Sequence, residues 1–275
     1  MKISLITATL GRYEELVTLF ESLKKQTYKN FELYLVDQNN DSKLKDLSND
    51  YQKYFSINYI HSTTKGLSLN RNIALKLADG DIIGFPDDDC YYSPDVLSNV
   101  IENLENTDDK IKFCAMRTFD SVTKKQNHKS DKIKIEKNDV LKKCISYNVF
   151  VKRNDKVLFD ERLGVGSYYS SGEETDFLYS IIENKNHYGI FINQSGIYHP
   201  SRASLNIDNE RIYKYSLGFG ALMKKDYIIR NNINSLFVFI YYILRSLGGY
   251  IKSLGNSKYY HSLKGKFNGF ISFNP

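Results

Sequence analysis

The first 110 residues alternate between short apolar runs and segments with helical spacing. We predict strands at 2–9, 31–37, 57–62 and 81–86, and helices at 13–27, 43–55, 67–79 and 93–104. In the first helix, Leu16, Leu19, Phe20 and Leu23 have the spacing of an apolar helical face. Strands that alternate with helices form parallel β-α-β units, which predicts an α/β fold with a mostly parallel central sheet flanked by helices.

This alternation becomes irregular after about residue 111. We predict strands at 111–119, 146–153, 189–193 and 196–200, a polar loop at 120–132, a helix at 173–185, and only helices from about Asn209. In the helix at 93–104, Ser93 is the predicted N-cap and Pro94 the first helical residue. We therefore expect one domain over 1–208 and a helical C-terminal extension over 209–275.

Composition limits the class of protein. The hydrophobic fraction of 41% is enough for a folded core. The three cysteines are widely spaced and form no CxxC pair, so neither a zinc knuckle nor a disulfide framework is indicated. We expect a reducing cytoplasm, and the first residues show no signal-peptide pattern.

The net positive charge of the chain comes from its C-terminal extension. Residues 211–275 hold ten Lys or Arg and one acid, a net charge of +9 against +6 for the whole chain. The apolar run from Leu236 to Leu244 is too short to span a membrane, which takes about 20 residues. We predict peripheral contact with anionic lipid on the inner face of the cell membrane; a buried core helix or a homodimer contact is the alternative. No nucleic-acid partner is predicted, because no recognition module is present.

Three adjacent carboxylates, Asp87, Asp88 and Asp89, follow the predicted strand at 81–86, and Asp37 ends the strand at 31–37. In an open parallel sheet, ligands bind beyond the carboxyl ends of the strands. A divalent cation that binds both these carboxylates and a diphosphate would offset the repulsion between the carboxylates. In an extended D-x-D segment, Asp87 and Asp89 point the same way and Asp88 points the opposite way. The alternative is a solvated loop before a helix.

Five segments together resemble a known family: "TATLGR", "VDQNND", "KGLSLNRN", "FPDDDC" and "SGEETDF". In this order and spacing they are similar to family 2 glycosyltransferases of the GT-A fold, above all to bacterial enzymes that build capsule, O-antigen or other surface polysaccharide. The resemblance covers about residues 2–200. It implies a nucleotide-binding half at 1–110 and an acceptor-binding half at 111–208. The implied reaction is inverting transfer of a sugar from a nucleotide-sugar donor to a saccharide or lipid-linked acceptor.

The resemblance also assigns site residues. It implies Mn²⁺ or Mg²⁺ as the cofactor, with Asp89 as its direct ligand, Asp87 beside it and His199 as a third ligand. The residues implied for nucleotide-sugar binding are Thr7, Thr9, Arg12, Asp37, Gly66, Arg71, Asn72, Asp87 and Asp88. A carboxylate at Asp37 can accept the N3–H of uracil or thymine, which favours a UDP or dTDP donor. Each of these residues also has a structural interpretation, such as Asp37 capping its own turn.

The acidic pair Glu173 and Glu174 begins the predicted helix at 173–185. The family has an aspartate at the second position, as the catalytic base, so the resemblance implies Glu174 as the base and Glu173 as the substitute candidate. The alternative is that both acids favour the helix N-terminus electrostatically. Arg202 is a further candidate for contact with the diphosphate.

Other classes of protein fit the sequence less well. A non-catalytic nucleotide-sugar-binding module at the membrane would keep Asp87 and Asp89 but have no working base. A sugar-nucleotide pyrophosphorylase would have a GxGTR-type loop after the first strand, and a dinucleotide oxidoreductase would have G-x-G-x-x-G there. The segment "TATLGRYEE" provides neither.

Overall fold

The computed structural model describes residues 1–128, 134–200 and 207–275. The chain divides into two compact units. The first comprises Met1–Lys65, Leu69–Leu158 and Phe177–Leu205, and the second comprises Gly66–Ser68, Phe159–Asp176 and Asn206–Pro275. The predicted division into a catalytic domain at 1–208 and an extension at 209–275 stays a prediction. The second compact unit combines the helical extension with a segment from the middle of the chain.

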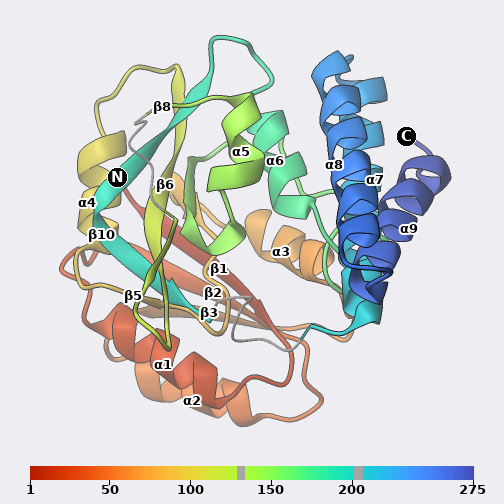
Figure 1. The fold of residues 1–275 in the computed structure, drawn as a ribbon. Helices are drawn as coiled ribbons and strands as arrows, with labels where there is room; N and C mark the ends of the chain where they lie inside the picture. The colour runs from red at the N-terminus through yellow and green to blue at the C-terminus, as the bar shows by residue number, and fades with distance from the viewer. Residues whose placement is uncertain (129–133, 201–206) are drawn as a thin grey trace. The chain divides into compact units, whose positions relative to one another are not determined.

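The first unit is built on a sheet in the order β3-β2-β1-β4-β9-β6-β10-β5, with β7 on β6 and β8 on β10 (Figure 1). Strands β1 to β4 pair in parallel, as do β6 and β10, whereas β9 runs antiparallel to both β4 and β6. The predicted fold class is therefore confirmed, with antiparallel strands inserted after β4. The strands are β1 Ile3–Thr9, β2 Phe31–Asp37, β3 Ser56–His61, β4 Ile82–Gly84, β5 Tyr91–Tyr92, β6 Ile111–Asp120, β7 Gln126–His128, β8 Lys134–Ile135, β9 Val149–Lys152 and β10 Tyr188–His199.

Helices lie on both faces of this sheet. The predicted apolar face of α1 is fully buried and shares a core with Phe31, Leu33 and Leu35 of β2. Because side chains alternate along a strand, Tyr34 points to the opposite face, where its hydroxyl donates to the Leu77 carbonyl just beyond α3. The helices outside the C-terminal segment are α1 Glu14–Lys24, α2 Lys43–Tyr51, α3 Leu67–Leu75, α4 Val96–Leu104, α5 Lys137–Lys143 and α6 Glu173–Ile181, with a 3-10 turn at Ser146–Asn148.

Several local predictions were wrong. The predicted loop at 120–132 contains β7, and its residues 129–132 lie outside the described part. The two short strands predicted at 189–193 and 196–200 form one strand, β10, with an irregular register between Ile192 and Gly196. Ser93 does not cap α4, because its hydroxyl donates to the Gly196 carbonyl, and the helix begins at Val96. In each case pairing with a distant segment prevailed over the local pattern.

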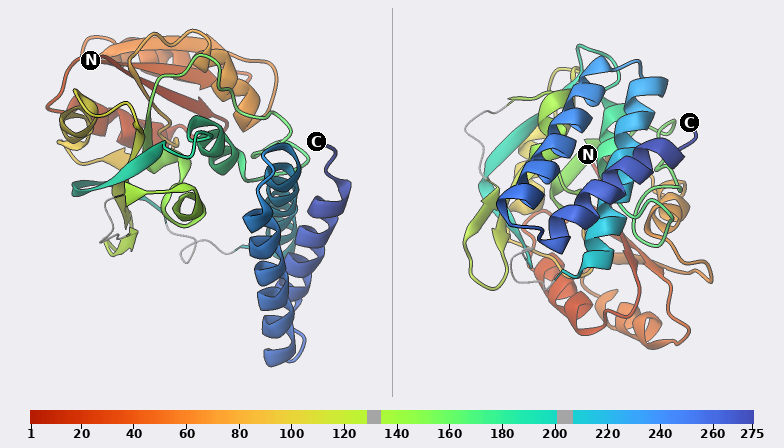
Figure 2. Two further views of the ribbon diagram at one scale, coloured as in Figure 1. Left: turned by 90° about the horizontal axis from the view of Figure 1, so that it is seen from above. Right: turned by 45° about the vertical axis from the view of Figure 1, so that its right-hand side comes forward.

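The prediction of helices beyond Asn209 is confirmed. The second unit contains α7 Asn209–Ile229, α8 Ile233–Lys252 and α9 Ser257–Ser272, which lie side by side (Figure 2). Their N-caps are Asp208, Asn232 and Asn256, and each accepts a backbone N–H two or three residues on. Helices α7 and α9 approach so closely that a Cβ at Gly269 would lie 1.9 Å from the Leu217 carbonyl oxygen. Among the described helices, none has the length and hydropathy of a membrane crossing.

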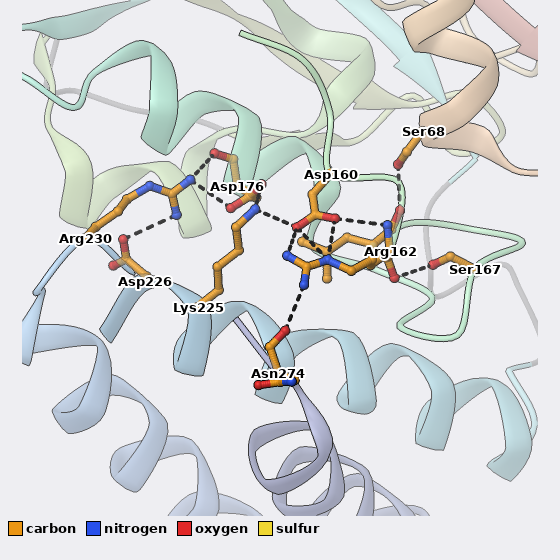
Figure 3. A network of polar contacts seen from close by, with 10 residues as sticks. Ser68, Asp160, Arg162, Ser167, Asp176, Lys225, Asp226, Arg230 and Asn274 are labelled. Atoms are coloured by element: carbon orange, nitrogen blue, oxygen red, sulfur yellow. Dashed lines mark hydrogen bonds and ion pairs between the residues drawn. The ribbon is translucent and has the colours of Figure 1, made fainter. Parts of the chain in front are cut away.

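A network of ion pairs joins α7 to the middle segment of the second unit (Figure 3). Lys225 Nζ lies 2.7 Å from both Asp160 Oδ2 and Asp176 Oδ2. Arg230 Nη2 lies 2.8 Å from the other oxygen of Asp176, whose side chain is only 3% exposed. Burial would raise the pKa of Asp160, but Arg162 and Lys225 outweigh it and hold that pKa far below its usual range. The first turn of α6 is therefore anchored to the C-terminal helices through Asp176.

Substitution of Lys225 by Met removes one cation from the buried carboxylate of Asp176 and from the partly buried carboxylate of Asp160. We expect Lys225→Met to lower the free energy of unfolding by about 3 kcal/mol, as for other broken buried pairs. The matched control is Lys214→Met, because Lys214 pairs with Glu210 on the exposed face of α7. Solvent screens this pair, so we expect a much smaller loss than for Lys225→Met. Urea unfolding followed by circular dichroism measures both, and equal losses would contradict a structural role for the network.

Lys266 of α9 is buried beside hydroxyl groups instead of a carboxylate. Its side chain is 8% exposed, and its Nζ donates to Ser246 Oγ at 2.9 Å and to Ser262 Oγ. Burial, with Arg245 nearby, lowers the pKa of Lys266 to about 8. The folded protein therefore carries the cost of a buried charge at neutral pH.

This cost predicts a pH-dependent difference in stability. Between about pH 8 and pH 10.5, Lys266 is protonated in the unfolded chain and deprotonated in the folded one. The destabilising contribution of Lys266 therefore decreases as the pH rises through this window. We expect Lys266→Met to be more stable than wild type at pH 7 and to lose that advantage toward pH 10.5. Denaturant unfolding across this range tests it, with the exposed Lys264→Met as control; parallel curves for wild type and Lys266→Met would contradict the buried charge.

Candidate functional site

The site of the first unit lies at the carboxyl ends of β1, β2 and β4. Because these strands are parallel, their ends meet at one edge of the sheet, and Thr9 at the end of β1 pairs directly with Asp37 at the end of β2. The chain leaves β4 through Phe85 and Pro86 before it reaches the three aspartates. Thr7 Oγ1 donates to the Pro86 carbonyl at 3.0 Å, which holds this exit against β1.

The three adjacent aspartates lie in a turn, not in the extended conformation expected from the sequence. The Cys90 N–H donates to the Asp87 carbonyl at 3.2 Å and closes the turn. Each carboxylate then has a different partner, which reduces the repulsion between neighbours. Arg71 lies 2.8 Å from Asp87, Thr9 donates to Asp88 at 2.8 Å, and Arg12 lies 2.6 Å from Asp89.

Two of the aspartates share a site with His199. The ligand atoms of Asp87, Asp89 and His199 lie within 4.8 Å of one another. His199 Nε2 is 2.9 Å from Asp89 Oδ1 and 3.8 Å from Asp87 Oδ2, whereas Asp88 points to Thr9. The pairing of Asp87 with Asp89, and the separate direction of Asp88, match the geometry expected from the sequence although the backbone differs.

The sheet explains how His199 reaches the aspartates from 110 positions away. Strand β5 begins at Tyr91, directly after the turn, and pairs antiparallel with Ile197 and Tyr198 at the end of β10. His199 is therefore the next residue after this pairing. Its ring stacks on Tyr147, with centroids 4.3 Å apart and planes 3° from parallel.

The hydrogen bonds of His199 decide what each ring nitrogen can do. Nδ1 lies 2.7 Å from the Pro200 carbonyl oxygen. A carbonyl oxygen only accepts, so Nδ1 carries a proton, and Nε2 faces the carboxylates. This arrangement is typical of metal-binding histidines, in which the second nitrogen is fixed by a backbone carbonyl.

Burial and neighbouring charge move the pKa values within the cluster in different directions. Burial raises the pKa of Asp88 to about 6, against the hydrogen bond from Thr9. Burial also favours a higher pKa for Asp89, but His199 and Arg12 outweigh it and lower that pKa to about 2. For His199, burial opposes the charged form, while Asp89 and Asp87 more than compensate and raise its pKa. Asp89 is therefore ionised at neutral pH, as a metal ligand must be.

The donor set fits a hard or borderline divalent cation. Two carboxylates and one imidazole provide oxygen and nitrogen ligands, which suit Mn²⁺, and the carboxylates also suit Mg²⁺. The remaining coordination positions would belong to water or to a diphosphate. Asp87, Asp89 and His199 are therefore the residues that could hold the ion implied by the sequence.

Asp37 is fully buried, and its carboxylate is hydrogen-bonded within the protein. Oδ1 accepts from the backbone and side-chain nitrogens of Asn39 at 2.9 and 2.7 Å, and Oδ2 accepts from the Tyr59 hydroxyl at 2.8 Å. This geometry is the turn-capping arrangement that the sequence left open. Recognition of a nucleobase by Asp37 stays a prediction.

The remaining candidates fall in different parts of the chain. Asn72 is buried in α3 of the first unit. Gly66, Glu173 and Glu174 belong to the second unit, where Gly66 has a φ of 135° and the two acids open α6. Glu173 is buried and Glu174 is half-buried. Arg202 lies outside the described residues.

Three residues that contact Asp37, Asp87 or His199 were not predicted from the sequence. Ser146 donates to Asp87 at 3.2 Å, Tyr147 stacks on His199, and Tyr59 donates to Asp37. Ser146 and Tyr147 reach the site because β9, which follows them, pairs with β4. No local motif marks them, so only strand order could have identified them.

Comparison with known proteins gives the family. The model of the family described as "Glycosyl transferase family 2" matches residues 4–163. A glucosyl-dolichyl phosphate glucuronosyltransferase from Haloferax volcanii is 27% identical over 114 residues, which are 40% of this chain and 36% of that protein. The UDP-Glc:alpha-D-GlcNAc-diphosphoundecaprenol beta-1,3-glucosyltransferase WfaP from Escherichia coli is 32% identical over 103 residues, 38% of this chain and 41% of WfaP. The matched segments thus span well under half of these relatives.

Solved structures share the fold over a longer part of the chain. S. aureus TarS 1–349 in complex with UDP-GlcNAc has a TM-score of 0.61 and 17% identity, covering 99% of this chain and 93% of that one. The Pyrobaculum calidifontis mannosyltransferase PcManGT, in complex with GDP-Man and Mn²⁺, has a TM-score of 0.60 and 14% identity, covering 82% and 63%. The matched family model spans the strand ends and the aspartate turn, and the chain belongs to glycosyl transferase family 2.

Proposed function

We propose that this protein is a metal-dependent, inverting glycosyltransferase that uses a nucleotide-sugar donor, UDP-linked in our assignment, in the synthesis of a bacterial surface polysaccharide. The observation that carries the proposal is the cluster of Asp87, Asp89 and His199 at the carboxyl edge of the sheet. Family membership supports the reaction class, and the UDP-GlcNAc complex of TarS supports the choice of donor.

In this proposal Asp87, Asp89 and His199 hold Mn²⁺, or Mg²⁺ as the second choice. The bound ion supplies Lewis-acid stabilisation of the departing diphosphate. Arg71 and Ser146 keep Asp87 in position, and Arg12 does the same for Asp89. Thr7, Thr9, Gly66, Asn72 and Asp88 complete the proposed donor site. In this proposal Asp37 contacts the base through a carboxylate lone pair that its hydrogen bonds with Asn39 and Tyr59 do not use.

The acceptor needs a general base, and we assign this role to Glu174. Its carboxylate takes the proton from the acceptor hydroxyl as that oxygen attacks the anomeric carbon, while the bond to the diphosphate breaks on the opposite side. Transfer in one displacement inverts the configuration. Glu173, which is buried beside it, is the substitute candidate and otherwise orients the acceptor.

We propose a saccharide carried on a lipid as the acceptor. The names of the two relatives describe acceptors linked to dolichyl phosphate and diphosphoundecaprenol, which supports this class of molecule. Such an acceptor places the enzyme at the inner face of the cell membrane, with the basic C-terminal helices as the contact. The comparisons do not favour a non-catalytic binding module or a pyrophosphorylase.

Loss of one metal ligand should remove cation-dependent donor binding. We expect Asp89→Asn to bind UDP equally with and without Mn²⁺, whereas the wild type binds at least tenfold more tightly with Mn²⁺, because a charged ligand is lost. Isothermal titration calorimetry measures this, with Asp95→Asn at an exposed nearby position as the control. A wild-type response to Mn²⁺ in Asp89→Asn would refute the metal assignment.

Loss of the base should separate binding from transfer. We expect Glu174→Gln to bind UDP and Mn²⁺ as wild type does, yet to lower kcat for sugar transfer by about 10²-fold or more. Glu183→Gln, at an exposed position two residues beyond the end of α6, should transfer normally. The assay follows UDP release from a panel of UDP-sugars with lipid-linked acceptors. Normal transfer by Glu174→Gln, together with loss of transfer in Glu173→Gln, would assign the role of the base to Glu173 instead.

A further inference from the structure

Helix α8 exposes a continuous apolar face. Apart from the adjacent Ile240 and Tyr241, its exposed apolar side chains follow one another at intervals of three or four residues. They are between 40% and 66% exposed, rising to 96% at Leu254 just beyond the helix. They are Ile233, Phe237, Ile240, Tyr241, Leu244, Leu247, Ile251 and Leu254. At roughly 100 Å² of exposed apolar area each, the eight form a patch on the order of 800 Å², larger than the ~300–600 Å² of a typical monomer's largest patch. We call these eight residues the α8 face.

The opposite side of α8 packs against α9 within the second unit. Ser235, Phe239 and Ser246 are buried, and Phe239 stacks on Phe270 of α9 with ring centroids 4.3 Å apart. A Cβ at Gly249 would lie 2.3 Å from the Tyr259 ring, so α8 also has no room to move closer to α9. The α8 face is therefore the side available to a partner, over a helix about 30 Å long.

The charge around the α8 face is of one sign. No Asp or Glu occurs in residues 227–275, which contain six Lys or Arg. Arg245 and Lys252 follow directly after members of the α8 face and are exposed, as are Lys258 and Lys264 of α9. Two copies meeting through this surface would bring like charges together, with no acid in 227–275 to pair with them. An anionic surface would instead attract each basic residue that approaches it.

We propose that the α8 face lies flat on an anionic lipid surface. Its apolar side chains lie at the boundary between headgroups and acyl chains, and Arg245 and Lys252 lie at the level of the phosphates. This inference names the surface for the membrane contact proposed above. It does not depend on the donor, the metal or the base. The occupant is a lipid leaflet, because an apolar stripe with basic residues at its edge complements headgroups and chains together.

The test uses the full chain and vesicles of phosphatidylglycerol and phosphatidylcholine in equal parts, with pure phosphatidylcholine vesicles for comparison. We expect the wild type to sediment with the anionic vesicles and not with the neutral ones. In Leu244→Asn with Ile251→Asn, affinity should fall about tenfold for each substitution. Leu77→Asn with Val122→Asn, exposed positions of the first unit, serves as the matched control and should bind as wild type does.

A second pair of variants tests the charge separately, in case the apolar substitutions disturb folding. Arg245→Gln with Lys252→Gln should weaken binding about fivefold for each charge removed, whereas Lys25→Gln with Lys45→Gln, exposed in the first unit, should not. Hydrolysis of UDP-sugar in solution should be the same in all of these variants, which distinguishes loss of lipid contact from loss of the proposed activity.

Three outcomes would overturn the proposal. The first is that the α8-face variant binds anionic vesicles as tightly as wild type. The second is equal binding of wild type to neutral and anionic vesicles. The third is a wild-type dimer, by light scattering, that the Leu244→Asn and Ile251→Asn substitutions dissociate while vesicle binding is absent, which would assign the α8 face to a second copy.

Discussion

The arrangement of the site depends on how three adjacent carboxylates are kept apart. Like charges in neighbouring residues repel, and burial makes each of them more costly. A turn closed between Asp87 and Cys90 directs the three side chains to different partners: a guanidinium from α3, a hydroxyl from the end of β1, and a guanidinium from the residues after β1. Two of the carboxylates still converge on one point, where a cation would add the charge that the protein does not provide.

The third member of this cluster, His199, comes from β10, a strand that is distant from the aspartates in the sequence. A two-residue strand, β5, follows the aspartates and pairs with the end of β10, so the position of His199 is tied to the position of Asp89 by backbone hydrogen bonds. The Pro200 carbonyl and the Tyr147 ring then fix the imidazole. Such rigid placement would suit a bound cation, because a metal site tolerates only small errors in distance.

The C-terminal helices are part of a compact unit that includes the beginning of α6. Lys225 and Arg230 of the C-terminal segment hold Asp176, and Arg162 reaches the Asn274 carbonyl at 2.8 Å. Helices α8 and α9 of the same unit contain Lys and Arg but no Asp or Glu. The proposed base and the proposed lipid contact therefore belong to the same structural unit, which suits the proposed transfer to a lipid-linked acceptor.

Sequence alone determined the elements whose signal is local. The alternation of apolar runs and helical spacing identified β1 to β4 with the helices between them, and the resemblance in five ordered segments led to the family. Tertiary structure decided what depends on pairing between distant segments. It showed that β9 inserts between β4 and β6 and that Ser93 binds Gly196 instead of capping α4. It also showed that Ser146 donates to Asp87 and that Tyr147 stacks on His199. The reason is that strand order and side-chain partners are set by contacts across the sheet, which no local spacing of residues encodes.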